Sequence, residues 1–269
     1  MCELLGMNCN VPTDILFSFR GFRRRGGATG PHADGWGIAF YEQRGCRLFH
    51  EPAPSAHSPM ALFLQSFPIK SRNVIAHIRK ARAGSVCVEN THPFHRELWG
   101  RTWVFAHNGL LRGVKRRPLK GFRPIGTTDT EHAFCYMLDV IRREFPTPPA
   151  LGRLRRLIAE LAADLATLGE FNFLLCDARA LFAHCSTKLV YIQRKAPFSR
   201  AALADDDLEV DFSTVTTPND RVVVVATAPL TRNEQWQPMA PGSLAVFTDG
   251  KLRRSEAGQA HDPLDGGSR

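Results

Sequence analysis

The segment MCELLGM, residues 1–7, opens the 269-residue chain and decides how the rest of it is interpreted. Removal of Met1 would leave Cys2 as the first residue, with a thiol and a free α-amine together. An α-amine has a pKa of about 7.7–8.0, so it can act as a base near neutral pH. One residue would then supply both a nucleophile and its base. A cysteine in second place also occurs by chance, so the interpretation needs support from other positions.

Short apolar runs that are partly β-branched predict buried strands, and amphipathic spacing predicts helices. The expected strands are residues 2–7, 36–41, 74–78, 103–106, 171–176, 180–184, 189–192, 222–226 and 244–247. The expected helices begin after residues 12–13, at Ser58-Pro59, at a capping box formed by Thr128 and Glu131, and near Leu151. In the capping box, each side chain would satisfy the other residue's backbone N–H. Strands precede and follow the two long helices. This order favours an α+β fold with two mainly antiparallel sheets and outer helices over a doubly wound parallel sheet.

No linker divides the chain, so we expect one domain at residues 1–250 and a polar, fraying tail at 251–269. No apolar run is long enough to cross a bilayer, and the N-terminus lacks the basic start of a signal peptide. The seven cysteines are scattered and odd in number, which indicates a reducing compartment, the cytoplasm. No second pair of cysteines or histidines occurs at zinc-type spacing, so we expect neither a metal nor another cofactor.

The chain has a net charge of +9, with basic runs at residues 20–25, 112–117 and 153–156. A nucleic-acid surface is one explanation. We favour the explanation that these runs are solvated loops and helix faces, because no nucleic-acid motif accompanies the charge. An acidic substrate or acidic partner is an intermediate alternative. Residues 197–220 are acidic and are interpreted as an excursion between strands.

Asn108 and Gly109 follow the apolar residues 102–105. In isolation, Asn-Gly is typical of a hairpin turn. The functional interpretation is an oxyanion hole, in which the Asn108 amide and the Gly109 N–H donate to a tetrahedral intermediate. Losing one such donor typically slows a reaction by about 10²–10³-fold.

Two charged residues at the ends of expected elements could bind an amino-acid head group. Arg79 ends a strand, and its planar guanidinium suits a carboxylate, although a surface arginine is the ordinary case. Asp129 stands at a helix start, inside the capping box, and could also hold an ammonium group. Trp36 lies in Asp34-Gly-Trp-Gly37 and would either wall the pocket or pack in the core.

Six motifs occur in the order found in class-II glutamine amidotransferases: Cys2, residues 34–37 (DGWG), 77–79 (HIR), 91–94 (THPF), 107–109 (HNG) and 128–131 (TDTE). From Cys2 to about Phe247, the chain resembles stand-alone members of that family and the related γ-glutamyl hydrolase of ergothioneine synthesis. The resemblance implies an N-terminal-nucleophile hydrolase fold, a four-layer α/β/β/α sandwich. In one departure, residues 80–84 (KARAG) replace the aromatic residue and the Thr-His-Gly segment of sugar-synthesising relatives.

The resemblance also implies a role for individual residues. Cys2 matches the nucleophile, and Asn108 and Gly109 match the oxyanion hole. Arg79 matches the residue that binds the α-carboxylate of glutamine, and Asp129 matches the acid that binds the α-ammonium group. His92, which precedes Pro93, matches a histidine of the glutamine-site region.

Three functions follow as hypotheses. The first is hydrolysis of the side-chain amide of glutamine through a γ-glutamyl thioester on Cys2, with ammonia passed to a partner synthetase or released. The second is hydrolysis of a larger γ-glutamyl conjugate in thiol metabolism. The third is a non-enzymatic binding module on an inactive scaffold, which is disfavoured because nucleophile, oxyanion donors, Arg79 and Asp129 are all present. We expect no membrane or nucleic-acid partner, and a homo-oligomer is left open.

Overall fold

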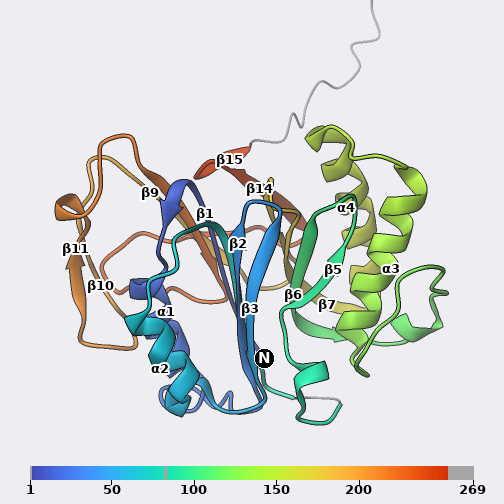
Figure 1. Ribbon diagram of the computed structural model, residues 1–269, viewed down its shortest axis with the longest axis horizontal. Coiled ribbons are helices and arrows are strands. Elements are labelled where there is room, and N and C mark those ends of the chain that lie inside the picture. Colours follow the sequence, from blue (N-terminus) through green and yellow to red (C-terminus); the bar gives the residue numbers. More distant parts are fainter. Residues whose placement is uncertain (1, 82–83, 254–269) are drawn as a thin grey trace, which may run out of the picture.

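Two large antiparallel sheets dominate the computed structural model, which describes residues 2–81 and 84–253 (Figure 1). The seven-stranded sheet has the spatial order β13 (Gln237–Pro238), β9 (Val190–Lys195), β12 (Arg221–Ala226), β1 (Glu3–Thr13), β4 (Ser71–Ile78), β2 (Trp36–Glu42) and β3 (Gly45–Glu51). The six-stranded sheet has the order β15 (Lys251–Arg253), β14 (Ser243–Thr248), β8 (Leu181–Cys185), β7 (Gly169–Cys176), β6 (Thr102–Leu111) and β5 (Phe94–Glu97).

Helices cover the outer face of each sheet. The helices α1 (Leu16–Arg24) and α2 (Pro59–Ser66) pack on the seven-stranded sheet. The helices α3 (Asp129–Glu144) and α4 (Leu151–Ala166) pack on the six-stranded sheet. Short 3-10 turns occupy Ser55–His57, Val88–Asn90, Val114–Arg116 and Phe212–Thr214, and a small hairpin pairs β10 (Arg200–Ala202) with β11 (Glu209–Asp211).

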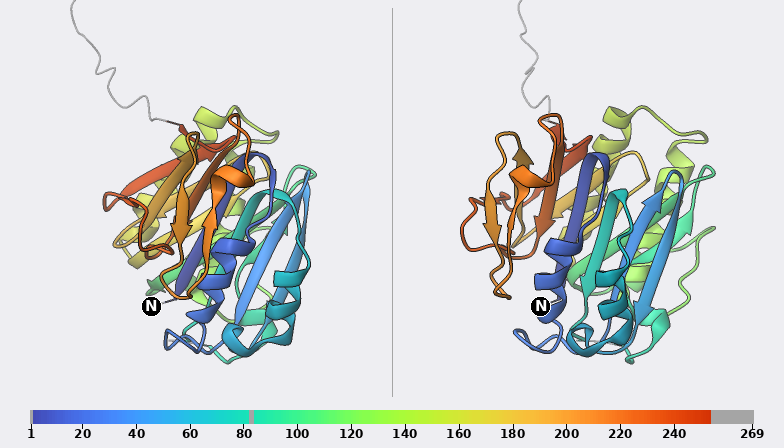
Figure 2. Two further views of the ribbon diagram at one scale, coloured as in Figure 1. Left: turned by 90° about the vertical axis from the view of Figure 1, so that its left-hand side faces the viewer. Right: turned by 60° about the vertical axis from the view of Figure 1, so that its left-hand side comes forward.

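The two sheets stack face to face and enclose an apolar core (Figure 2). Successive residues of a strand point to opposite faces, and β1 shows this directly. Leu4 packs between the sheets, whereas Leu5 packs under α1 and α2. The expected four-layer α/β/β/α sandwich is confirmed.

The expected strands and helices all form, and the strands missed from sequence are short or half-buried. The β3 strand is an example, because its exposed and half-buried side chains give no continuous apolar run. The β15 strand pairs with β14 and extends sheet structure three residues beyond the boundary expected at residue 250. The remainder of the expected tail, residues 254–269, lies outside the described residues.

Helix α3 begins as expected, but only one of the two hydrogen bonds of the predicted capping box forms. The Thr128 hydroxyl accepts the Glu131 N–H at 3.1 Å, as an N-cap should. The Glu131 carboxylate instead accepts the backbone N–H groups of Ile125 and Gly126, at 3.0 and 2.7 Å, and pairs with Arg96. It therefore holds the loop before the helix against β5 and does not return to the cap residue.

The first basic run, residues 20–25, packs against the acidic segment expected to be an excursion. Arg20 pairs with Asp206 at 3.0 Å, and Arg25 pairs with Asp205 at 2.8 Å. Arg25 is buried, so its charge is neutralised by contacts within the protein. No helix among the described residues is long and apolar enough to span a membrane.

Candidate active site

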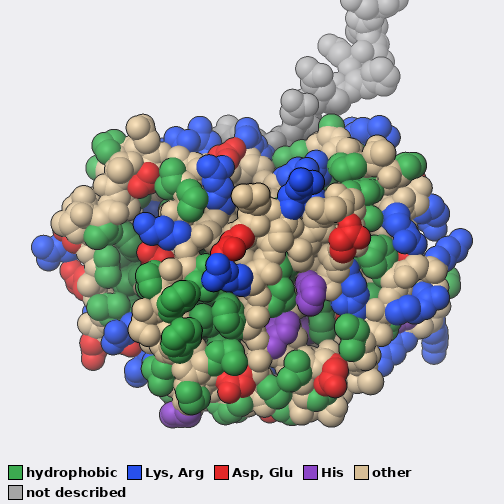
Figure 3. All heavy atoms as spheres, in the orientation of Figure 1, with side chains coloured by type: hydrophobic (Ala, Val, Ile, Leu, Met, Phe, Trp, Pro, Cys, Tyr) green, Lys and Arg blue, Asp and Glu red, His purple; other side chains and the backbone are tan. Residues whose placement is uncertain are grey.

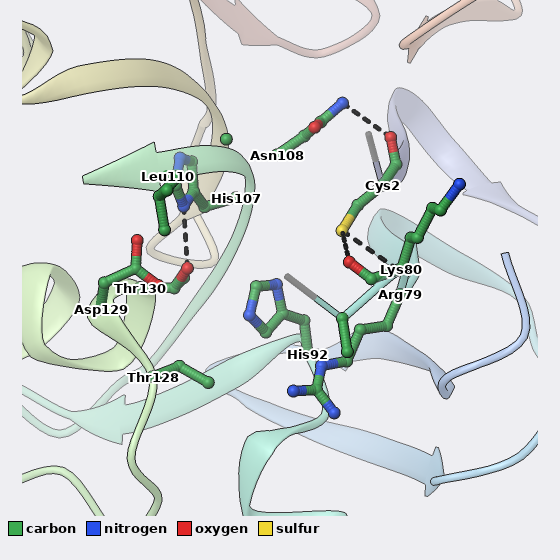
Figure 4. A pocket seen from close by; sticks show the side chains of 12 residues that line it. Cys2, Arg79, Lys80, His92, His107, Asn108, Leu110, Thr128, Asp129 and Thr130 are labelled. Carbon is green, nitrogen blue, oxygen red and sulfur yellow. Dashed lines mark hydrogen bonds between the residues drawn. The ribbon is translucent and has the colours of Figure 1, made fainter. Parts of the chain in front are cut away.

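The predicted catalytic and substrate-binding residues meet in one pocket, with Trp36 as the exception (Figure 4). Cys2 directly precedes β1, and Arg79 directly follows β4. Asn108 and Gly109 lie on β6, and Asp129 begins α3. The two sheets each supply one wall. Residues more than 100 positions apart in the chain thus face the same small space.

Cys2 is held at the end of a strand in the middle of its sheet. The neighbouring backbone is fixed on one side by β4 and on the other by Thr227, whose hydroxyl accepts the Leu4 N–H at 2.9 Å. The half-buried Cys2 Sγ lies 3.3 Å from the Lys80 backbone nitrogen and 3.5 Å from the Lys80 carbonyl oxygen. The Lys80 N–H therefore donates toward the sulfur, and the Lys80 carbonyl oxygen accepts from the thiol.

Asn108 lies directly beside the cysteine. Its side-chain nitrogen donates a hydrogen bond of 2.7 Å to the carbonyl oxygen of Cys2. That nitrogen carries two hydrogens, so a second remains for a group in the pocket. The side chain is buried and its amide plane is fixed by this bond, which suits a preorganised oxyanion donor.

The hairpin-turn interpretation of Asn108-Gly109 is wrong. Strand β6 continues through both residues to Leu111 and stays paired with β7. Gly109 has a φ of +154°, and a Cβ at this position would lie 1.8 Å from the Glu170 carbonyl oxygen. Only glycine fits here, because β7 passes too close for any side chain.

Arg79 is buried at the pocket wall and is positioned from two directions. Its backbone N–H donates to Gly35 O at 2.7 Å, and its carbonyl accepts the Asp34 N–H at 3.1 Å. The first glycine of the DGWG motif therefore serves to bring a backbone carbonyl against Arg79. The guanidinium Nη1 donates to the Ser85 carbonyl oxygen at 2.9 Å. The arginine is thus already oriented before any ligand binds.

Asp129 is the first residue of α3 and lies across the pocket. Its Oδ2 accepts the Leu111 N–H at 2.7 Å, which ties the helix start to the end of β6. A carboxylate at a helix N-terminus is favoured by the helix dipole. It can therefore attract an ammonium group.

Three histidines lie under the pocket. His92 lines it, and the His92 ring packs on His77 with 4.1 Å between ring centroids. Burial lowers the pKa of His92 well below its ordinary value and lowers the pKa of His77 to about 3, with neighbouring His107 and Arg79 adding to the shift of His77. Both rings are therefore neutral at physiological pH.

The third ring, His107, has a defined tautomer. Its Nε2 lies 2.9 Å from the Glu170 carbonyl oxygen, which can only accept, so Nε2 carries the hydrogen. Burial lowers the pKa of His107, so the ring is neutral and Nδ1 accepts the Thr130 hydroxyl at 2.8 Å. No role was predicted from sequence for His77 or His107. In the motifs quoted above, His77 stands two residues before Arg79, and His107 directly precedes Asn108.

Trp36 does not line this pocket. Its ring is buried under α1, with its centroid 5.9 Å from that of Phe19, and its Nε1 donates to Glu51 at 3.0 Å. The role of pocket wall assigned to Trp36 is therefore wrong, and the alternative of core packing holds. Trp36 was predicted to line the pocket because it adjoins Gly35, whose carbonyl oxygen accepts the Arg79 N–H. The Trp36 side chain itself packs in the core under α1.

The chain belongs to the class-II glutamine amidotransferases, whose family pattern matches residues 1–264. Its fold is the N-terminal-nucleophile sandwich of that family. A B. subtilis glutamine phosphoribosylpyrophosphate amidotransferase has the same fold at a TM-score of 0.58 and 15% identity, covering 94% of this chain and 48% of that one.

Relatives of similar length are much nearer in sequence. YafJ of Escherichia coli (strain K12), provisionally named a glutamine amidotransferase, is 55% identical over 252 residues, covering 93% of this chain and 99% of YafJ. A provisionally named glutamine amidotransferase of Haemophilus influenzae is 47% identical over 268 residues, covering 100% of this chain and 91% of the relative. The 2.0 Å crystal structure of a predicted glutamine amidotransferase from Pseudomonas aeruginosa PA01 has a TM-score of 0.75 and 46% identity, covering 93% and 99% of the two chains.

Proposed function

We propose that the chain hydrolyses the side-chain amide of glutamine through a γ-glutamyl thioester on Cys2. The observation that carries this proposal is the convergence of Cys2, Arg79, Asn108, Gly109 and Asp129 on one pocket. A sulfur nucleophile and oxyanion donors lie on one side of it. A cation and an anion suited to an α-amino acid head lie on the other.

The reaction proceeds in two stages. The Cys2 sulfur attacks the amide carbon, and the oxyanion of the tetrahedral intermediate accepts hydrogen bonds from the Asn108 amide and the Gly109 N–H. The carbon–nitrogen bond breaks, and the α-amine exposed by loss of Met1 passes the thiol proton to the departing ammonia. Water then attacks the thioester, which releases glutamate and restores the thiol.

The charged groups orient the substrate. Arg79 pairs with the α-carboxylate and Asp129 with the α-ammonium group, so the side-chain amide points toward Cys2. The hollow between these groups is small, about 40 Å³.

The test is ammonia and glutamate release by the purified full chain, with glutamine and a panel of larger γ-glutamyl amides as substrates. Cys2→Ala should abolish release. Cys46→Ala is the matched control, because burial raises the pKa of that thiol to about 11 and it lies on β3. Mass spectrometry should find Met1 removed and one diazo-oxo-norleucine adduct on Cys2.

The outcomes separate the hypotheses. Activity on a larger conjugate but not on glutamine would favour the conjugate hydrolase. Full activity in Cys2→Ala, or an active protein that retains Met1, would refute the mechanism. Ammonia transfer to a partner synthetase is a further part of the proposal, and it predicts that release from glutamine increases when the acceptor enzyme is present.

A further inference from the structure

A second cavity lies on the outer face of the seven-stranded sheet, away from Cys2. It is larger than the catalytic pocket, about 450 Å³. One wall is α1, the floor is β1 and β12, and the other wall is the segment from Phe198 to Thr216 that carries β11. In Figure 1 this segment forms the left edge of the molecule. A volume of this size is typical of small-molecule sites.

The lining is mainly apolar and contains aromatic rings. Val222 and Val224 of β12 form part of the floor, and Phe17 and Phe212 meet edge to face with 5.3 Å between ring centroids. An apolar floor with ring walls favours a planar apolar molecule, because burying such a surface is favourable by about 25 cal/mol per Å².

Polar groups at the cavity define what the ligand must carry. The Gln65 side chain lines the cavity, and its amide nitrogen is buried with no hydrogen-bond partner among the described residues. An unpaired buried donor costs about 1–3 kcal/mol, and a ligand acceptor would remove that cost. Arg194 lines the cavity with a nearly buried guanidinium, which pairs with Glu234 at 2.6 Å and lies 4.7 Å from the Phe212 ring centroid. Asp14 also lines the cavity, and its carboxylate accepts the Leu16 N–H at 3.2 Å.

We propose that this cavity is a binding site for a small molecule with a planar apolar body and a hydrogen-bond-accepting oxygen. The apolar body packs against the rings of Phe17 and Phe212, which contact each other, and the oxygen accepts from the Gln65 amide once that side chain turns toward the cavity. This site is separate from the catalytic pocket and does not depend on the reaction at Cys2.

The probe for the test is 8-anilinonaphthalene-1-sulfonate, which combines aromatic rings with acceptor oxygens and fluoresces when its rings leave water. The full native chain should bind it at one saturable site. Thr216→Trp, which fills the cavity, should weaken binding at least about tenfold. Thr214→Trp is the matched control, because it lies in the same segment outside the cavity and loses a similar hydrogen bond to a backbone carbonyl. Gln65→Leu should weaken binding by about tenfold, the size expected for one hydrogen bond to a charged acceptor.

The main competing site is the exposed apolar face of α2, seen at the lower left of Figure 3 and formed by Met60, Leu62, Phe63 and Phe67. Phe63→Ser should leave the affinity unchanged. Loss of binding in Phe63→Ser, equal binding in Thr216→Trp and Thr214→Trp, or an absence of saturation would overturn the proposal. Thermal unfolding and glutamine hydrolysis of Thr216→Trp show whether that variant is folded. If it is not, Gln65→Leu decides the question.

Discussion

Arg25 and Glu3 form an ion pair, with 3.1 Å between Nη1 and Oε2, that joins the end of α1 to the residue next to Cys2. The same guanidinium binds Asp205 at 2.8 Å and donates to the carbonyl oxygens of Ala228 and Pro229. One buried cation therefore connects four segments that are distant in sequence. Because Glu3 adjoins Cys2, this cation also helps to fix the backbone that carries Cys2.

Replacing Arg25 by Met should be severely destabilising. The substitution leaves the partly buried carboxylates of Glu3 and Asp205 without their cation, and breaking a buried ion pair in this way costs about 3–5 kcal/mol. Urea unfolding measures the change. Arg20→Met is the control, because the Arg20 side chain is about half exposed in its pair with Asp206 and should contribute at most about 1 kcal/mol. Equal losses in the two variants would contradict this account.

Replacing Gly109 by Ala should remove glutamine hydrolysis and lower stability. A Cβ at residue 109 would lie 1.8 Å from the Glu170 carbonyl oxygen, so β6 and β7 would have to separate where the oxyanion donor lies. Gly113→Ala is the matched control, since Gly113 also has positive φ, +79°, but a Cβ there would meet no atom within 4 Å. Kinetics and thermal unfolding of both variants should show the large effect only at residue 109, and a fully active Gly109→Ala would argue against the proposed donor.

Replacing Arg79 by Lys should raise KM for glutamine more than it lowers kcat. Lysine keeps the charge but loses the two-pronged contact to the α-carboxylate, worth roughly 10–100-fold in binding. Arg72→Lys is the control, because Arg72 lies on β4, the strand that Arg79 directly follows, and its side chain is exposed. Steady-state kinetics with glutamine test the prediction. An unchanged KM in Arg79→Lys would remove Arg79 from the substrate site.

The buried His77 ring should make the protein less stable in mild acid. Its pKa is about 3 in the folded chain, below the ordinary value of about 6.5 that applies when unfolded. The unfolded chain therefore takes up a proton first as pH falls. The stability contribution is intact above about pH 6.5 and is lost progressively as the pH falls toward 3. For this one group the loss from pH 7 to pH 5 is about 2 kcal/mol.

His77→Phe should remove that share of the pH dependence. Urea unfolding at pH 7 and pH 5 measures it, with His57→Phe as the control at an exposed position. A His77→Phe protein with the same loss of stability between the two pH values as the wild type would show that this ring is not the source.

Local features of the sequence predicted most of the fold. The run 221–226 is β-branched and apolar, and it forms β12. Thr128 is a cap residue before an amphipathic stretch, and it begins α3. The partner of Glu131 could not be predicted, because a carboxylate can reach several N–H groups and only the path of residues 125–126 decides among them.

The sequence patterns did not predict which residues far apart in the chain form ion pairs. Arg25 and Asp205 are 180 positions apart, and charge alone did not indicate that a basic run and an acidic run would neutralise each other. The candidate site residues could be predicted, because their motifs occur in the order found in a known family. Asn108-Gly109 shows the limit of local patterns, since the dipeptide that usually makes a hairpin turn continues a strand here.

The position of Cys2 at one end of the molecule has a practical consequence for preparing it. The start of β1 and the last described strand, β15, lie at opposite ends of the sandwich (Figure 1). An affinity tag fused in front of Met1 would block the amine that the proposed mechanism requires, even if the protein folds and purifies normally. Recombinant material for the assays above should therefore carry its tag after the last residue or have a leader removed cleanly at Cys2.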